Sequence, residues 1–273
     1  MDNRGPRMGM GTNCQLVVLA TTPCLTRGRI VSSARFNTCT MASSATGLLV
    51  PPDGTTPLFG GAMTVILPPG WLDCSDARPV PDHQEVWLEK DGEARSIIIE
   101  ILERPEECGD DGCALYHFVD IAEANGAAGQ RITYTDKLPA TALRPSLAQA
   151  VGPCFALHGV QVLPPQGAAG RLGREPPPES TGGGGGGGAA EGAAPAGSVQ
   201  LELAIAIVRL PRQKTDLLVS VNRGRPLPPS SSEGGAHEAA EAQQLVDAQA
   251  DASLLASVVG SLEVRDYALF GES

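Results

Sequence analysis

The residues best placed to do chemistry are six carboxylates in one stretch of the chain, from Leu58 to Glu103. They are Asp73, Asp76, Asp82, Glu85, Glu100 and Glu103. The chain has no G-x-S-x-G or H-E-x-x-H motif and no Cys/His pair with a plausible orienting residue. We therefore expect no enzyme. We interpret the carboxylates either as a solvated sheet face or as an acidic patch that binds a basic protein partner.

A second group of reactive side chains, Cys108, Cys113 and His117, follows this stretch. Structural zinc sites use four ligands, usually as C-x-x-C-type pairs. Three ligands separated by four and three residues match that pattern weakly, and a loop followed by a helix explains the spacing better. We expect neither a metal nor another cofactor.

Short strands and turns must position the carboxylates. An apolar run from Met63 to Leu67 predicts a strand that ends at Pro68-Pro69-Gly70, because proline cannot donate to a ladder. Asp73 and Ser75 can cap a single helical turn through Ala77.

Two longer strands follow. Alternation predicts a strand over Gln84–Glu89, and Asp91-Gly92 is a hairpin-turn signal. The next strand runs from about Arg95 to Leu102, and its three consecutive isoleucines predict a central strand covered on both faces. Glu100 lies inside that strand, where an unpaired buried carboxylate is costly, so it needs an internal basic partner or an open surface. Strand periodicity places Glu100 and Glu103 on opposite faces unless a bulge or the strand end intervenes.

The sequence pattern in the middle of the chain predicts further helices and strands. They are a helix over Ala114–Ala124, a possible strand over Arg131–Thr135, a possible helix over Ser146–Ala150, and strands over Cys154–Leu163, Val199–Arg209 and Thr215–Val221. The last two form an antiparallel hairpin, because only a few residues separate them. Arg209 and Asp216 flank its turn and could pair with each other.

The C-terminal part predicts a loop over residues 223–235 and a long helix over Glu238–Leu262. The helix has one apolar stripe that should dock on the sheet, formed by Leu245, Ala248, Ala252, Leu255, Val259 and Leu262. A coiled coil is the alternative use of this stripe. The order of all elements predicts an α+β fold with a mostly antiparallel central sheet sandwiched by helices.

Composition limits the class of partner. The formal net charge of −11 disfavours binding to nucleic acid or to an anionic membrane, and suits a basic protein partner or simple solubility. Seven scattered cysteines favour a reducing compartment over a disulfide framework. No run of about 20 apolar residues is present, so we expect no membrane insertion. We expect a monomer.

Low-complexity segments set the domain limits. Residues 1–56 have no pattern typical of a helix or a strand, so we expect a disordered extension there. We expect residues 57–273 to form one domain with a Gly-rich insert at 164–197. The first 40 residues are rich in Arg, Ser and Thr with one acid, which resembles an organelle transit peptide. Met41 offers an ordinary start, so this leader could instead reflect an upstream start.

A set of short motifs occurs in fixed order between residues 57 and 271. They are Leu58-Phe59-Gly60-Gly61-Ala62, Leu67-Pro68-x-Gly70, Asp73-x-Ser75-Asp76-x-Arg78-x-Val80-Pro81-Asp82-x-Gln84-Glu85-Val86, Ser96-Ile97-Ile98 through Glu103, Tyr116-His117-Phe118, Arg209-Leu210-Pro211-x-Gln213-x-Thr215-Asp216-Leu217-Leu218, and Phe270-Gly271. In these motifs the chain resembles the Mog family of Ran-binding nuclear import factors, also called Ran guanine-nucleotide release factors.

The resemblance implies a fold similar to the photosystem II oxygen-evolving-complex protein. It also implies binding to the small GTPase Ran, release of its guanine nucleotide, and a role in protein import into the nucleus. The expected location is the nucleus and cytoplasm. It supports Glu100 and Glu103 most as contacts, because the family has an acidic pair at matching positions, although relatives can carry Asp where this chain has Glu100. Asp82 and Glu85 join this contact surface, with Asp73 and Asp76 nearby. A chloroplast lumen protein of the oxygen-evolving-complex type is the alternative if the leader is a transit peptide.

Overall fold

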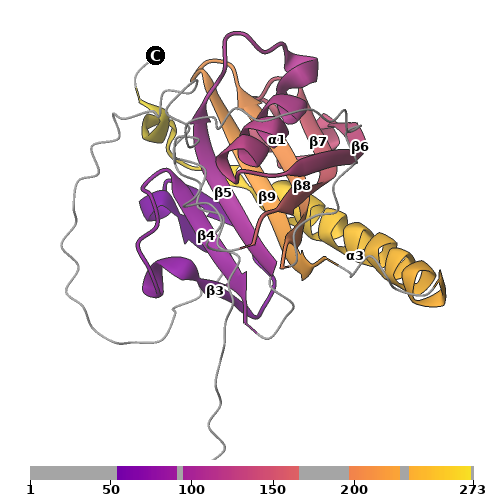
Figure 1. Cartoon of the computed structure of the whole chain (residues 1–273). Helices are drawn as coiled ribbons and strands as arrows, with labels where there is room; N and C mark the ends of the chain where they lie inside the picture. The colour runs from indigo at the N-terminus through magenta and orange to yellow at the C-terminus, as the bar shows by residue number, and fades with distance from the viewer. Residues whose placement is uncertain (1–53, 91–94, 166–196, 228–233, 272–273) are drawn as a thin grey trace, which may run out of the picture.

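The main feature of the computed structural model is a seven-stranded antiparallel sheet with the strand order β3-β4-β5-β9-β8-β7-β6 (Figure 1). The structure describes residues 54–90, 95–165, 197–227 and 234–271. The strands are β3 (Trp71–Asp73), β4 (Gln84–Glu89), β5 (Arg95–Glu103), β6 (Gly129–Leu138), β7 (Cys154–Leu163), β8 (Val199–Leu210) and β9 (Thr215–Pro226). A second, three-stranded sheet contains β1 (Thr56–Leu58), β2 (Met63–Val65) and β10 (Glu263–Val264).

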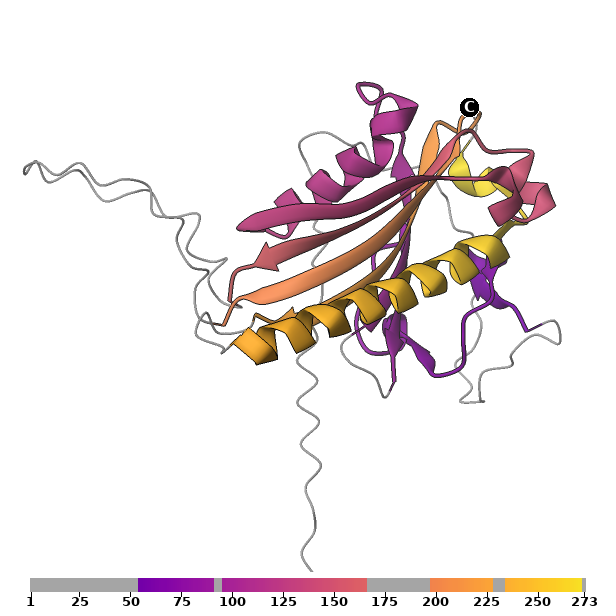
Figure 2. The ribbon, with the colours of Figure 1, turned by 90° about the vertical axis from the view of Figure 1, so that its right-hand side faces the viewer.

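Helices cover both faces of the large sheet. Helix α1 (Cys113–Ala124) lies on one face and the long helix α3 (Gly234–Ser261) crosses the other, as Figures 1 and 2 show from two directions. The shorter helical segments are η1 (Phe59–Gly61), η2 (Cys74–Asp76), η3 (Asp110–Gly112), η4 (Ala140–Ala142), α2 (Pro145–Ala148) and η6 (Tyr267–Phe270). The predicted α+β fold with an antiparallel sheet between helices is confirmed. In the described part of the chain, no helix has both the length and the apolar character needed to span a membrane.

The sheet consists of two meanders that meet at one seam. Strands β3, β4 and β5 follow one another in sequence and in space, and so do β6, β7, β8 and β9. The seam is the antiparallel pairing of β5 with β9, which runs without a bulge from Arg95 opposite Arg223 to Glu103 opposite Thr215. Strand β5 therefore lies inside the sheet, as its three isoleucines predict.

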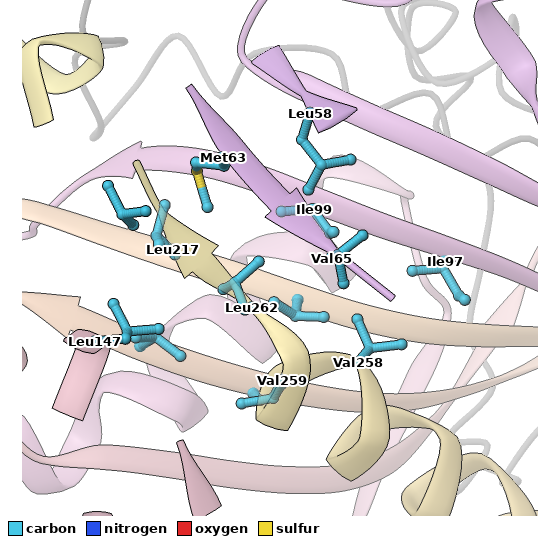
Figure 3. Packing of buried hydrophobic residues seen from close by; sticks show 14 of the residues in the cluster. Leu58, Met63, Val65, Ile97, Ile99, Leu147, Leu217, Val258, Val259 and Leu262 are labelled. Atoms are coloured by element: carbon cyan, nitrogen blue, oxygen red, sulfur yellow. The ribbon is translucent and has the colours of Figure 1, made fainter. Parts of the chain in front are cut away.

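Two hydrophobic layers follow from the alternation of side chains along the strands. On the α1 side, Leu201, Leu203, Ile205 and Ile207 of β8 pack with Phe118 of α1. On the α3 side, the small Ala204 and Ala206 are buried in the layer that α3 covers. Figure 3 shows this second layer where β2, β5 and the C-terminal end of α3 converge, through Met63, Val65, Ile97, Ile99, Val258, Val259 and Leu262.

Close packing fixes how α1 sits on the sheet. Gly159 of β7 lies under the ring of Phe118, and a Cβ atom at this position would come within 2.5 Å of Phe118 Cζ. Real Cβ atoms do not approach that closely, so this glycine is required for the fit of the ring against β7.

Several element boundaries differ from the sequence predictions. Strand β6 covers Gly129–Leu138, well beyond the predicted Arg131–Thr135, and β9 continues to Pro226 through the start of the predicted loop. Both strands gain length because each has an adjacent strand that pairs with it along its whole extent. The Asp91-Gly92 turn and most of the 164–197 insert lie outside the described residues. The strands that flank the insert, β7 and β8, pair with each other from Leu163 opposite Val199.

The predicted apolar stripe of the long helix is correct only in its C-terminal half. Leu255, Val259 and Leu262 are buried, but the Leu245 side chain is 74% exposed and Ala252 is also exposed. The N-terminal half is turned so that Asp251 and Asp247 face the sheet instead. Arginines at the end of β9 cause this orientation, because they bind these two carboxylates.

Those contacts form a network that we call the α3-side cluster, which comprises Glu89, Arg95, Glu202, Arg223, Arg225, Asp247 and Asp251. Arg223 donates two hydrogen bonds to Asp251, at 2.8 Å and 2.6 Å. Arg95 donates to Asp251 at 3.3 Å and to Glu89. Arg225 pairs with Asp247, and its Nε lies 3.4 Å from Glu202 Oε1. The helix is thus held by charge at one end and by apolar packing at the other.

Candidate partner-binding site

Three of the six predicted carboxylates, Asp73, Asp82 and Glu85, line one cleft of about 350 Å³. The cleft lies between the start of β4, the one-turn helix η2 and the turn that contains Phe59 and Gly60. Its lining contains no Lys, Arg or His. The cleft therefore presents unbalanced negative charge to any molecule that enters it.

The Leu58-Phe59-Gly60-Gly61 motif builds one wall of the cleft. Gly60 and Gly61 have φ values of 67° and 94°, which favour glycine, and Phe59 has a φ of 49°. This turn buries the Phe59 ring and aims its backbone N–H at the Glu85 side chain, which accepts the hydrogen bond at Oε1. The turn therefore fixes the position of Glu85 in the cleft.

The charge state of Glu85 reflects this environment. Burial raises the pKa of its carboxyl group, and the nearby Asp73 charge adds to the rise. The hydrogen bond from Phe59 opposes both effects. A positive group that entered the cleft would favour the ionised form of Glu85, so the site is suited to bind a cation.

Asp73 caps the predicted one-turn helix and Asp76 ends it, and the structure confirms this turn as η2. Asp73 Oδ1 accepts a hydrogen bond from the Ser75 N–H at 2.8 Å, the expected cap. Asp76 is exposed at the end of the turn and does not line the cleft.

Glu100 and Glu103 do not form one patch. Glu100 is 7% exposed, and its Oε1 accepts a hydrogen bond from Gln84 Nε2 at 2.8 Å. His83 Nε2 lies 3.5 Å from the same oxygen, so two side chains, Gln84 and His83, contact the Glu100 carboxylate. Glu103 is exposed at the end of β5, opposite Thr215. Because the β5 ladder has no bulge, the two side chains lie on opposite faces, as their spacing predicts.

Glu100 is nevertheless connected to the cleft through one hydrogen bond. Gln84, which binds it, is itself part of the cleft lining. The sequence analysis predicted the two strands and the turn between them, but not the register that places Gln84 opposite Glu100.

A second group of polar residues from the motifs forms what we call the α1-side cluster: Asp110, His117, Arg209 and Asp216. The Arg209 side chain is fully buried and donates to Asp216 from Nε at 3.0 Å and from Nη2 at 3.1 Å. Its Nη1 donates to Asp110 at 2.7 Å. His117 Nε2 lies 2.9 Å from Asp216 Oδ2. The predicted Arg209–Asp216 pair is therefore present, and Asp216 is also the partner of His117, which the sequence analysis did not assign.

This cluster is not arranged for nucleophilic chemistry. Cys113 packs beside it, and burial raises the pKa of that thiol to about 12, so the thiolate is scarce at neutral pH. Burial likewise raises the pKa of Cys108. Within the described residues, no three His, Cys, Asp or Glu side chains are grouped closely enough to hold a metal ion.

Comparisons with known proteins identify relatives of this chain. The profile of a family described as Ran-interacting Mog1 protein matches residues 56–224, a span that includes the cleft and the Arg209–Asp216 hairpin. The human Ran guanine nucleotide release factor is 32% identical over 177 residues, which cover 64% of this chain and 78% of that protein.

Other matches are more local. The nuclear import protein mog1 of Schizosaccharomyces pombe is 46% identical over 80 residues, which cover 29% of this chain and 42% of that protein. The match to the bovine Ran guanine nucleotide release factor covers 43% of that protein, so in both cases the chain aligns with less than half of the relative.

A solved structure supports the fold. The Saccharomyces cerevisiae Ran-binding protein Mog1p aligns with a TM-score of 0.53 and 23% identity, over 80% of this chain and 97% of that one. The relatives are named for nuclear import and Ran, and they do not support the chloroplast-lumen alternative.

Proposed function

The chain belongs to the Ran-interacting Mog1 family, and from this premise we propose that it binds the small GTPase Ran, promotes release of its guanine nucleotide and so supports protein import into the nucleus. The observation that carries the proposal is the match of one family profile over residues 56–224. The acidic cleft lies inside this span, which gives the proposed activity a specific surface.

We propose that Asp73, Asp82 and Glu85 receive a basic side chain of the GTPase. Their cleft lacks any basic residue of its own, and the rigid Phe59–Gly60 turn holds Glu85 in place. A cation in such a cleft gains charge-assisted hydrogen bonds without displacing an internal partner. The negative net charge of the chain would also speed the approach of a basic surface.

The other three predicted acids take different roles in this proposal. Asp76 and Glu103 are exposed outside the cleft and belong to its surroundings. Glu100 lies beneath the surface and supports Gln84 in the lining. A direct contact through Glu100 would require Gln84 or His83 to move.

The proposed activity requires no general base or nucleophile in this protein. A release factor must bind the nucleotide-free GTPase more tightly than the loaded one, because only differential affinity shifts that equilibrium. Complementary charge in a preformed cleft can supply such a difference when the basic group of the partner is accessible in only one of the two states.

The test is release of labelled guanine nucleotide from purified Ran, with and without the full chain. We expect faster release and a stable complex with nucleotide-free Ran on gel filtration. Asp82→Lys should weaken that complex by about tenfold or more, because the reversed charge repels the basic group. Glu123→Lys, a matched reversal at an exposed position on α1, should leave it unchanged.

The possible outcomes separate two claims. No acceleration and no complex would overturn the proposed function. A complex that both variants leave intact would keep Ran as the partner and reject the cleft as its contact surface.

We also propose that the protein resides in the nucleus and cytoplasm, in line with this function. Microscopy of a full-length fluorescent fusion would check this, and accumulation in chloroplasts would contradict it.

A further inference from the structure

Strand β6 forms one outer edge of the large sheet. Among the described residues it pairs with β7 alone, so the backbone N–H and C=O groups on its other side have no adjacent strand (Figure 1). Nine of its ten residues are exposed. The strand at the opposite edge, β3, has three residues. The β6 edge is therefore the longer of the two edges at which an extended segment could add a strand.

A β-bulge determines how the large side chains of this edge are placed. The register with β7 shifts between Ile132, which is opposite Gly159, and Tyr134, which is opposite His158. Because neighbouring residues of β7 point to opposite faces, Ile132 lies on the α1 side of the sheet and Tyr134 on the α3 side. Their side chains are 41% and 54% exposed. An added strand would therefore meet one large side chain on each face.

The edge carries a local excess of positive charge. Arg131 and Lys137 are exposed, and neither forms an ion pair within the described part of the chain. Asp136, the acid of this strand, accepts hydrogen bonds from the Tyr134 hydroxyl at 2.7 Å and from the Lys137 N–H at 2.8 Å. Charges more than about 8 Å away are largely screened at physiological ionic strength, so the two cations outweigh the distant acids of the chain here.

The two cations lie on opposite faces of the sheet. Arg131 is opposite Val160 and Lys137 is opposite Phe155, so five positions of β7 separate them. An odd separation along a strand places two side chains on opposite faces. A partner strand that sets an acidic side chain against each cation therefore needs two acids with four residues between them.

We propose that the β6 edge binds an extended acidic segment of a partner protein by strand addition. Carboxylates of the segment lie opposite Arg131 and Lys137, and apolar side chains lie opposite Ile132 and Tyr134. Backbone hydrogen bonds supply most of the affinity in this mode of binding, and the side chains supply the specificity. This inference goes beyond the proposed function and does not depend on it.

The bulge favours a single extended segment over a second copy of the sheet. A bulge and a lysine at the edge are features by which natural sheets avoid pairing with another sheet. A second folded copy would have to match the bulge without distorting its own strands, and it would present the same excess of positive charge. One extended segment can bend with the edge, and its acids complement that charge.

The β6 edge is remote from the acidic cleft. Six strand spacings of about 4.8 Å separate β6 from β3, which amounts to about 29 Å across the sheet. The cleft is lined by Asp73 of β3 and Glu85 of β4. The two sites can therefore be occupied together, by a basic group of one partner and an acidic segment of another.

Calorimetric titration of the full chain with a synthetic peptide tests the proposal. The probe, Thr-Glu-Thr-Thr-Val-Val-Glu-Thr, has the required acid spacing and is written for antiparallel addition. We expect it to bind at concentrations up to about 1 mM, and a peptide with lysine at both glutamate positions to bind about tenfold more weakly. N-methyl groups on alternate residues should abolish binding in one of the two possible sets and preserve it in the other, because only every second N–H faces β6.

A charge swap makes the test independent of any loss of stability. Arg131→Glu combined with Lys137→Glu should weaken binding of the probe by about tenfold and should strengthen binding of the lysine peptide. Arg212→Glu, a reversal at an exposed position in the β8–β9 turn, should change neither. Circular dichroism checks that the variants are folded. Release of nucleotide from Ran should be the same for the double variant and the parent, so the two proposals can fail separately.

Three results would overturn the proposal. They are no binding of the probe by the parent chain, equal effects of the two N-methylated sets, and a double variant that binds the probe like the parent. Sedimentation of the chain alone should show the monomer expected from the sequence. A dimer that the double variant dissociates would assign the edge to a second copy instead.

Discussion

The two buried charge clusters lie on opposite faces of the same sheet and differ in what they connect. The α1-side cluster is centred on one hairpin turn, since Arg209 and Asp216 are paired neighbours of β8 and β9, and it attaches Asp110 of η3 and His117 of α1 to this pair. The α3-side cluster joins the far end of β9 and the start of β5 to a helix that follows in the sequence. Both clusters attach a helical segment to the sheet, but the first is built around a pair of cross-strand neighbours and the second around contacts between the sheet and the helix itself.

The difference shows two uses of buried charge. The Arg209 side chain has no solvent exposure. Once the hairpin has formed, its charge is therefore costly unless the carboxylate partners are in place. Around Asp251 the charges replace the apolar stripe that would otherwise hold the helix, and they fix its rotation. That rotation is what leaves Leu245 and Val246 outside.

Removal of the Asp216 carboxylate should have the largest effect. Asp216→Ala leaves the buried Arg209 with Asp110 alone and takes the partner from His117. We expect the free energy of unfolding to fall by about 3–5 kcal/mol, the cost of an uncompensated buried charge. Urea unfolding measures it.

Asp110→Ala is the matched control, because that side chain is 38% exposed and Arg209 keeps both hydrogen bonds to Asp216, so we expect a loss of about 1 kcal/mol or less. Equal losses in the two variants would show that Asp216 has no special role in the cluster.

Removal of the Asp251 carboxylate should have a smaller and more local effect. Asp251→Ala deprives Arg223 of its two hydrogen bonds, while Arg95 keeps Glu89. We expect a loss of about 2–3 kcal/mol. Hydrogen exchange should become faster in the N-terminal half of α3 and stay unchanged in β8 and β9. Faster exchange throughout the sheet would mean that the two clusters do not differ in this way.

The smallest effect concerns Glu202, which belongs to a cluster where four carboxylates face three guanidinium groups. Burial raises the pKa of Glu202, against the opposing charges of Arg225 and Arg223. A raised pKa means that the folded state holds the proton more tightly, so stability falls as pH rises above the usual glutamate pKa.

Glu202→Gln removes this titration. In acid the variant and the parent should be equally stable. As the pH rises toward neutrality, the variant should become more stable than the parent by about 1 kcal/mol or less. Thermal unfolding at several pH values measures the difference. A variant less stable than the parent at neutral pH would mean that the Arg225 contact outweighs the burial of Glu202.

The sequence predicted those parts of the molecule that depend on nearby residues. The Asp73 cap, the β4 bounds, the β7 bounds and the Arg209–Asp216 pair all involve positions within about ten residues of each other, where spacing determines geometry. The acidic character of the cleft also followed from one short motif, since Asp73, Asp82 and Glu85 are close in sequence.

The parts that were missed depend on residues far apart in the chain. Nothing near His117 indicates Asp216, which is 99 positions away. The apolar stripe of α3 was extended to Leu245 because periodicity alone cannot show that arginines of β9 would select Asp247 and Asp251. The contact of Glu100 with Gln84 is closer in sequence, at 16 positions, but it depends on the exact register of β4 and β5, which the predicted hairpin alone does not determine.

The seam between β5 and β9 has a consequence for the order of folding. Its paired residues are separated by about a hundred positions or more, so the loop entropy is lost before any contact across the seam forms. Each meander can form from neighbouring segments, whereas the seam requires both to be in place. We expect the joining of β5 to β9 to limit the folding rate, so that substitutions within the seam slow refolding more than they accelerate unfolding.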